Sequence, residues 1–189
     1  ERTVQYFMEK PNIQLVIRIH PGEALVKHGS ILEMIKTTLP QLPPNIHVID
    51  PHAEVNTYDL VDMADLGLVY TTTVGLEMAL RGIPVIVAGK THYRNRGFTH
   101  DPLTWVDYFK TLNRTLENVK SVRLSQEEID LAWKYTYLFF FKYSQPFPWH
   151  MVFRKKDFKE ISLESVISRE GLKKYGNTFD LLTFKQPLG

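Results

Sequence analysis

The chain has 189 residues, of which 43% are hydrophobic and 23% charged, a composition typical of a globular protein large enough to bury a core. A formal net charge of +2 is too small to favour nucleic acid as a partner. There is no cysteine, which excludes disulfides and thiolate metal sites, and no run of about 18 apolar residues predicts a membrane-spanning helix.

The first hundred residues alternate short apolar runs with helical patterns. Strands are predicted at 14–19, 45–50, 66–70 and 83–89, and helices at 23–39, 56–64 and 74–82. This alternation is typical of a parallel sheet with right-handed crossovers. We therefore predict an α/β fold in which residues 1–103 form a Rossmann-like, doubly wound parallel sheet.

The pattern changes beyond residue 103, where helices are predicted at 103–113 and 125–143. Aromatic residues lie on all sides of the second helix, which favours burial in the chain's own core or against another domain, with a membrane interface as the alternative. We expect residues 104–189 to form a helical carboxy-terminal extension that packs on the first domain. Because the sequence opens within a helical pattern and without an initiator Met, we also expect an amino-terminal domain to be missing.

Three threonines follow the third predicted strand, at Thr71, Thr72 and Thr73. Ligands of open parallel sheets bind at the carboxyl ends of the strands, where helix amino termini offer unpaired N–H groups. The helix starting near Val74 would supply such groups, and Gly75 would let a ligand approach the backbone closely. The sequence contains no GxxxxGK, so we predict a phosphate cradle that is not a Walker loop. The alternative is that Thr72 or Thr73 only caps the helix.

A histidine follows the first predicted strand. Pro21 ends that strand and Gly22 provides a turn, so His20 is predicted to lie on a loop at the carboxyl edge of the sheet. There its ring can donate a hydrogen bond or a positive charge to a phosphate oxygen. The alternative is a structural histidine at a strand end. No group of histidines and acids has a known metal-ligand spacing, so we expect no metal.

Two stretches, "IRIHP" and "ADLGLVYTTTVGLEMALRGIPVIVAGKTHYRNRGFT", resemble the carboxy-terminal half of bacterial capsule polysaccharide biosynthesis proteins, a glycosyltransferase group of GT-B architecture. That family has a strand followed by His-Pro, then a Ser/Thr-rich turn before Gly-x-Glu-Ala, then Gly-x-Pro-Val and a later Tyr. The resemblance covers residues 14–100. This chain departs from the family at Met78, where Ala is usual, and in its run of threonines, where Ser-Thr is commoner.

The resemblance implies a nucleotide-sugar donor domain, one half of a GT-B fold. On this model His20, Thr72 and Thr73 hold the donor phosphate and require neither metal nor cofactor. Glu77 would accept hydrogen bonds from ribose hydroxyls, although an acid is also favourable in the first turn of a helix.

The loop after the fourth predicted strand supplies a second implied group of site residues. The side chains that would close over the sugar or phosphate are Tyr93, Arg94 and Arg96. A solvated basic loop is the alternative.

The resemblance also implies the function, namely a glycosyltransferase of capsular or surface polysaccharide biosynthesis. Its partners would be a nucleotide-sugar donor, a carbohydrate or glycolipid acceptor and the missing amino-terminal domain, which we expect to carry the catalytic base. We expect the protein to lie in the cytoplasm, where it could also associate peripherally with the inner face of the membrane. A nucleotide-sugar epimerase of the same architecture and a non-catalytic polysaccharide-assembly module are the alternatives.

Overall fold

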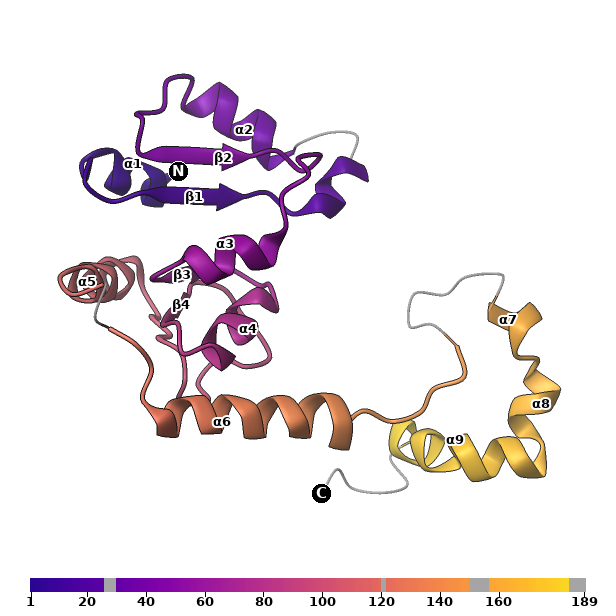
Figure 1. The fold of residues 1–189 in the computed structure, drawn as a ribbon. Helices are drawn as coiled ribbons and strands as arrows, with labels where there is room; N and C mark the ends of the chain where they lie inside the picture. The colour runs from indigo at the N-terminus through magenta and orange to yellow at the C-terminus, as the bar shows by residue number, and fades with distance from the viewer. Residues whose placement is uncertain (26–29, 120–121, 150–156, 184–189) are drawn as a thin grey trace. The chain divides into compact units, whose positions relative to one another are not determined.

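The computed structural model describes residues 1–25, 30–119, 122–149 and 157–183 (Figure 1). It divides into two compact units, Glu1–Ala64 (unit 1) and Asp65–Gly189 (unit 2). Each unit contains one parallel sheet of two strands. The predicted parallel pairing is therefore confirmed, but the strands are hydrogen-bonded as two separate pairs and not as one continuous sheet. A doubly wound sheet of all four strands stays a prediction.

Unit 1 follows the predicted alternation of helices and strands. Its elements are α1 (Arg2–Met8), β1 (Leu15–Arg18), a 3-10 helix (Pro21–Leu25), α2 (Ile31–Thr38), β2 (Ile46–Ile49) and α3 (Thr57–Met63). Figure 1 shows β1 and β2 side by side and pointing the same way. The helix predicted at 23–39 is shorter than expected: α2 begins after Ser30, whose side chain accepts a hydrogen bond from the backbone N–H of Glu33. Residues 26–29 of that prediction lie outside the described residues.

A buried asparagine, Asn45, connects the start of β2 to the segment between α1 and β1 by hydrogen bonds. Asn45 is 4% exposed, and its Nδ2 lies 3.0 Å from the carbonyl oxygen of Phe7, 3.1 Å from that of Lys10 and 3.0 Å from that of Ile13. The backbone of Asn45 also accepts a hydrogen bond from the N–H of Leu15, at the start of β1. The two N–H hydrogens of this amide are thus shared among three carbonyls near the segment that joins α1 to β1. The carbonyls of Phe7 and Lys10 also accept from the backbone N–H groups of Lys10 and Ile13.

Unit 2 begins with a second α/β arrangement. Its first elements are β3 (Gly67–Val69), α4 (Val74–Leu80) and β4 (Val85–Val87). All three residues of β4 are fully buried, as expected for a parallel strand covered on both faces. The other edge of β4 forms a parallel bridge to His100, where the chain returns after a loop. Both edges of β4 are thus occupied, and the ends of loop 90–102 are held close to the strand.

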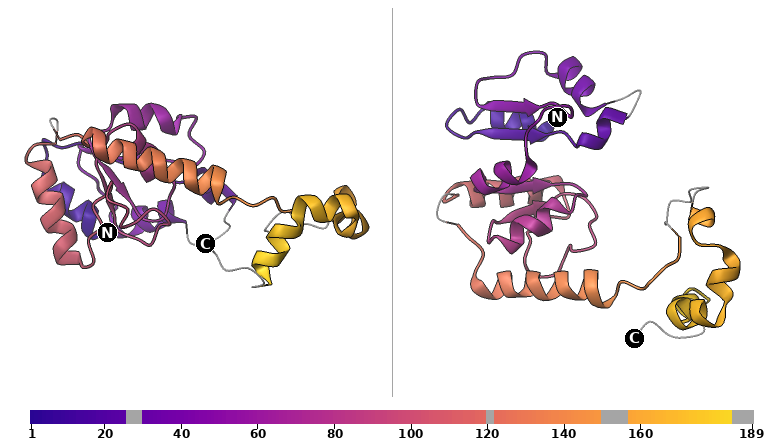
Figure 2. Two further views of the ribbon diagram at one scale, coloured as in Figure 1. Left: turned by 90° about the horizontal axis from the view of Figure 1, so that it is seen from below. Right: turned by 45° about the vertical axis from the view of Figure 1, so that its right-hand side comes forward.

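Two long helices follow the loop, close to the predicted positions. They are α5 (Trp105–Leu116) and α6 (Gln126–Tyr137), and α6 continues as a π-helical turn at Leu138–Lys142. Thr104 caps α5, and a capping box of Ser125 and Glu128 begins α6. Helix α5 packs against β4 and α6 packs against α4. The views of Figure 2 show α6, in orange, as one long straight helix.

Several aromatic residues of α6 and its π-helical turn are exposed, so of the two predicted kinds of burial the chain's own core does not supply theirs. Ala132 is the one buried residue of this helix, whereas Trp133, Tyr137 and Phe141 are 56%, 52% and 72% exposed. One face of the helix packs on α4 and loop 90–102, while Trp133, Tyr137 and Phe141 stay exposed to solvent. Contact with another domain and contact with a membrane stay predictions.

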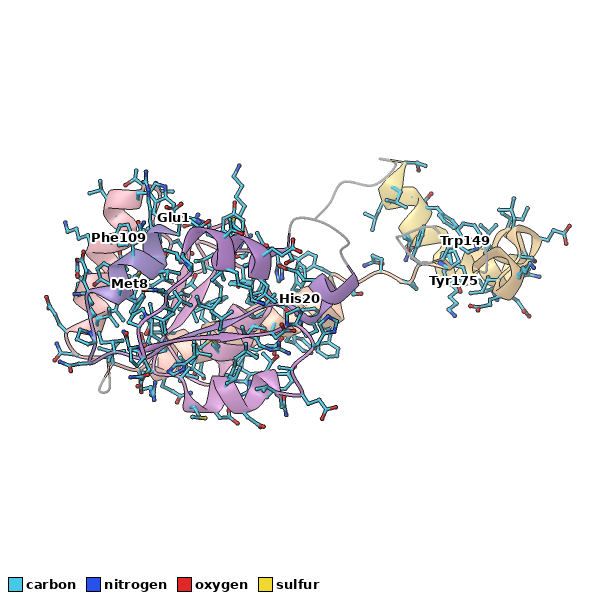
Figure 3. The ribbon with its side chains drawn as sticks, turned by 90° about the horizontal axis from the view of Figure 1, so that it is seen from above. Glu1, Met8, His20, Phe109, Trp149 and Tyr175 are labelled. Atoms are coloured by element: carbon cyan, nitrogen blue, oxygen red, sulfur yellow. The ribbon has the colours of Figure 1, made fainter. Side chains whose placement is uncertain are left out.

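The last described helices are α7 (Asp157–Glu160), α8 (Leu163–Ile167) and α9 (Arg169–Leu182). Helices α8 and α9 pack together, and Trp149 and Tyr175 lie in this part of the chain (Figure 3). The indole N–H of Trp149 donates to the carbonyl of Ile161 at 2.9 Å, and the hydroxyl of Thr178 donates to that of Pro146 at 2.7 Å. These bonds tie residues 146–149 to the final helices. The packing of a helical extension on residues 1–103 stays a prediction.

Candidate functional site

The threonine turn, Thr71–Thr73, lies between β3 and α4, as predicted. The N–H of Ala88 donates to the carbonyl of Val69 at 2.8 Å, so the carboxyl ends of β3 and β4 lie together below this turn. Thr71 and Thr73 are exposed and Thr72 is half-buried. In open parallel sheets, ligands bind at this end of the strands.

Sequence reasoning missed Tyr70, which directly precedes the threonine turn. The sequence predicts a strand that ends at this residue, but β3 ends at Val69 and the side chain of Tyr70 is 71% exposed. A large aromatic ring beside exposed hydroxyls offers a surface on which a planar group can stack. Its position directly after an apolar run was the available signal.

Helix capping does not explain Thr73. It occupies the N-cap position of α4, but its backbone is helical (φ −70°, ψ −18°) and its side chain makes no capping hydrogen bond. Its hydroxyl instead lies 3.4 Å from Oε1 of Glu77, which is a long contact. The hydroxyl of Thr72 accepts from the N–H of Val74 at 3.3 Å, so the local structural role belongs to Thr72.

Tyr93 holds the threonine turn in place through a hydrogen bond. Its side chain is fully buried, and its hydroxyl donates to the carbonyl of Thr72 at 2.6 Å. A Cβ at Gly75 would lie 2.5 Å from that hydroxyl and 2.9 Å from Cγ2 of Val69. The hydroxyl of Tyr93 therefore lies close to the backbone of Gly75, and the approach of a ligand to that backbone stays a prediction.

Arg94 also binds the chain itself. Its guanidinium donates to the carbonyls of Val87 at 3.1 Å and Gly89 at 2.6 Å, and to that of Pro102. These bonds close loop 90–102 at both ends. We had expected Tyr93 and Arg94 to close over a ligand; the structure gives both a supporting role, because their polar atoms are satisfied by backbone carbonyls.

Arg96 is the exposed cation of the three loop residues named from the sequence. Its guanidinium lies over the ring of Tyr135, 5.7 Å from the centroid, on helix α6. The hydroxyl of Tyr135 donates to the carbonyl of His92 at 2.7 Å, and the ring of His92 stacks on Phe139 at 4.1 Å. Sequence reasoning missed this junction between the loop and α6. Its signal was the pair of aromatic residues one helical turn apart.

His20 lies at the carboxyl end of β1, exposed, as predicted. Its Nδ1 accepts a hydrogen bond from the N–H of Gly22 at 2.9 Å, so the proton of the neutral ring lies on Nε2, which can donate outward. His20 belongs to unit 1 and the threonine turn to unit 2, and their shared cleft stays a prediction. In the described part of the chain, no group of three or more His, Asp or Glu residues has a geometry suited to a metal ion.

Tyr93 should make folding stability sensitive to alkaline pH. Burial raises the pKa of its hydroxyl from 10.0 to about 12. The unfolded chain loses this proton first, so the contribution is fully present below pH 10 and is lost as the pH rises through about 12. Denaturant unfolding across this range should therefore show a smaller loss of stability in Tyr93→Phe than in wild type. Tyr70→Phe removes an exposed hydroxyl and should behave as wild type; equal slopes for all three would contradict the assignment.

The fold and site define an α/β protein with a braced, hydroxyl-rich turn at the carboxyl ends of parallel strands. The family model described as capsule polysaccharide biosynthesis protein matches residues 4–138, most of the chain. The chain therefore belongs to the family of capsule polysaccharide biosynthesis proteins. Comparisons with curated proteins and with solved structures returned no match.

Proposed function

We propose that this chain is the nucleotide-sugar binding part of a glycosyltransferase that builds capsular or surface polysaccharide. The proposal includes a GT-B half in which the strands of both units join one doubly wound sheet, so that His20 and the threonine turn share a cleft. Membership of the capsule family supports the biosynthetic role. The partners proposed are a nucleotide-sugar donor, a carbohydrate or glycolipid acceptor and a further domain, at the cytoplasmic face of the membrane.

The observation that carries the proposal is the bracing of the threonine turn. Tyr93 fixes the carbonyl of Thr72 from inside, and the hydroxyls of Thr71 and Thr73 stay exposed at the strand ends. Donors held in place before a ligand arrives need little reorganisation, and they are most effective toward a charged group such as phosphate. A turn that served only to begin α4 would need neither the buried tyrosine nor two exposed hydroxyls.

Each proposed role follows from the atoms that remain available. The hydroxyls of Thr71 and Thr73 and Nε2 of His20 would donate to phosphate oxygens, and Arg96 would contribute a positive charge. Glu77, whose Oε1 lies 3.4 Å from the Thr73 hydroxyl, would accept from ribose.

In the transfer step, the bond between the sugar and the phosphate oxygen breaks and a glycosidic bond forms to an acceptor hydroxyl. The acceptor's proton passes to a base that we propose lies on another domain. The site on this chain would stabilise the negative charge of the leaving nucleotide.

Replacing Thr73 by Ala should weaken nucleotide binding without unfolding the protein. Loss of one charge-assisted hydrogen bond should lower the affinity for CMP, UDP or GDP, whichever binds, by about 1.5–3 kcal/mol. His20→Ala should cost a similar amount, and the double variant should lose less than the sum, because both groups would serve one anion. Isothermal titration calorimetry with each nucleotide and its nucleoside measures this, alongside the melting temperature.

The control is Thr37→Ala, which removes an exposed hydroxyl that bonds only the carbonyl of Glu33 in its own helix. It should leave nucleotide affinity unchanged. Binding of no nucleotide by wild type would favour the non-catalytic module, whereas binding with unchanged affinity in Thr73→Ala and His20→Ala would remove these residues from the site. A nucleotide-sugar epimerase would bind the donor equally well but would convert the sugar without an acceptor.

A further inference from the structure

Helix α6 and its π-helical turn carry a band of large apolar side chains exposed to solvent. We call this band the aromatic strip; its members are Trp133, Tyr137, Leu138, Phe140, Phe141 and Tyr143, all exposed. Scattered exposed apolar residues are normal, but a contiguous patch on one helix commonly marks an interaction surface.

Three rings of the aromatic strip lie away from the anchored face of α6, whereas the ring of Phe140 lies edge-on to that of His92, with centroids 6.3 Å apart. Trp133, Tyr137 and Phe141 recur every four residues and so lie on one side of the helix, and the rings of Tyr137 and Phe141 stack at 6.0 Å. The opposite side is anchored: Ala132 is fully buried, and Tyr135 bonds loop 90–102 through His92. The helix is thus held by one face while the other presents the rings.

The charges within the strip itself are positive, and the acids of α6, among them Glu127 and Asp130, precede it on the helix. From Leu131 to Trp149 the sequence contains Lys134 and Lys142 and no aspartate or glutamate. The ammonium of Lys142 lies 5.6 Å from the centroid of Tyr137, so one cation accompanies the rings directly. An anionic surface with an apolar interior complements both the rings and the lysines.

We propose that the aromatic strip binds the surface of a bilayer that contains anionic lipids. The helix lies parallel to the membrane, with Trp133, Tyr137 and Phe141 at the level of the headgroups and the acyl boundary and with Lys134 and Lys142 at the lipid phosphates. No helix of the described residues is long and apolar enough to cross a bilayer, and this mode of binding requires none. The inference goes beyond the proposed function, since it concerns a different surface and a different ligand.

Two tryptophans of nearly equal exposure give a matched test. Trp133 on α6 is 56% exposed and Trp105 on α5 is 52% exposed. Each has an acid within one turn of its helix, Asp130 and Asp107 respectively, but only Trp133 belongs to the aromatic strip. In the full chain, Trp105→Phe with Trp149→Phe leaves Trp133 as the one reporter, and Trp133→Phe with Trp149→Phe leaves Trp105. Each protein is mixed with phosphatidylcholine vesicles, with and without phosphatidylglycerol.

The Trp133 reporter should shift its emission to the blue on anionic vesicles and be quenched by brominated acyl chains, while the Trp105 reporter should change little. The double variant Lys134→Gln with Lys142→Gln should bind anionic vesicles about 25-fold more weakly, about 5-fold for each lysine. High salt should also weaken the binding of wild type. The control pair is Lys36→Gln with Lys110→Gln, which removes two exposed lysines from α2 and α5.

Several results would overturn the proposal. If the emission of Trp133 responds to no vesicle, the proposal is wrong, whether the strip is exposed or already covered by a protein domain. Concentration-dependent dimerisation lost in Trp133→Phe, without lipid binding, would assign the strip to a second copy. Equal responses from both reporters, or equal losses in both lysine pairs, would show adsorption without a defined surface. None of these outcomes depends on whether a nucleotide binds.

Discussion

Asn45→Asp should unfold unit 1 or come close to doing so, because it replaces a donor by an acceptor at the point where three carbonyls converge. The amide Nδ2 of Asn45 lies within 3.0–3.1 Å of the carbonyl oxygens of Phe7, Lys10 and Ile13. A carboxylate there would face the same oxygens while buried and without a partner, which costs about 3–5 kcal/mol. A whole domain has only about 5–15 kcal/mol of stability, so this is a large fraction.

The same substitution at another asparagine of unit 1 is the control. Asn56 caps α3 by accepting a hydrogen bond from the N–H of Tyr58 at 2.9 Å, and aspartate accepts equally well at an N-cap. Hydrogen exchange of the β1 and β2 amides should therefore rise sharply in Asn45→Asp and stay near wild type in Asn56→Asp. Acidic conditions that protonate the introduced carboxyl should restore part of the protection. Similar exchange in both variants would show that the convergence of carbonyls contributes little.

Gly75→Ala should displace Tyr93 and loosen the threonine turn. The added Cβ would lie 2.5 Å from the Tyr93 hydroxyl and 2.9 Å from a methyl carbon of Val69, closer than van der Waals contact allows. Overpacking costs about 1–3 kcal/mol, and separating the hydroxyl from the Thr72 carbonyl leaves a buried polar group that costs a further 1–3 kcal/mol or so. We expect a total loss of about 2–5 kcal/mol in denaturant unfolding, together with weaker nucleotide binding.

A double-mutant cycle tests this contact directly. Tyr93→Phe removes the oxygen that Gly75→Ala would strike, so the alanine should cost less in the phenylalanine background, with a coupling of about 1 kcal/mol or more. Gly176→Ala is the matched control on α9, where a Cβ would meet no atom within 4 Å. There alanine should stabilise the helix by up to about 1 kcal/mol. Additive losses at Gly75 and Tyr93 would mean that the two do not constrain each other.

Local patterns in the sequence predicted the elements of this protein well. Short apolar runs, capping residues such as Ser125 and the alternation of strand and helix depend on neighbours a few residues apart. These same signals put the threonine turn after a strand and His20 at the end of another, and the family resemblance to capsule biosynthesis proteins rested on those stretches. Parallel pairing followed from the order of the elements.

The tertiary structure decided what the predicted side chains contact, because those partners lie far apart in the chain. Tyr93 and Thr72 are separated by 21 residues and Asn45 and Phe7 by 38, distances at which no sequence period gives information. Loop 90–102 looked like a solvated or ligand-closing segment, yet Tyr93 and Arg94 turn inward because buried backbone carbonyls require donors. The aromatic face of α6 stays exposed because α4 and the loop cover the opposite face of that helix.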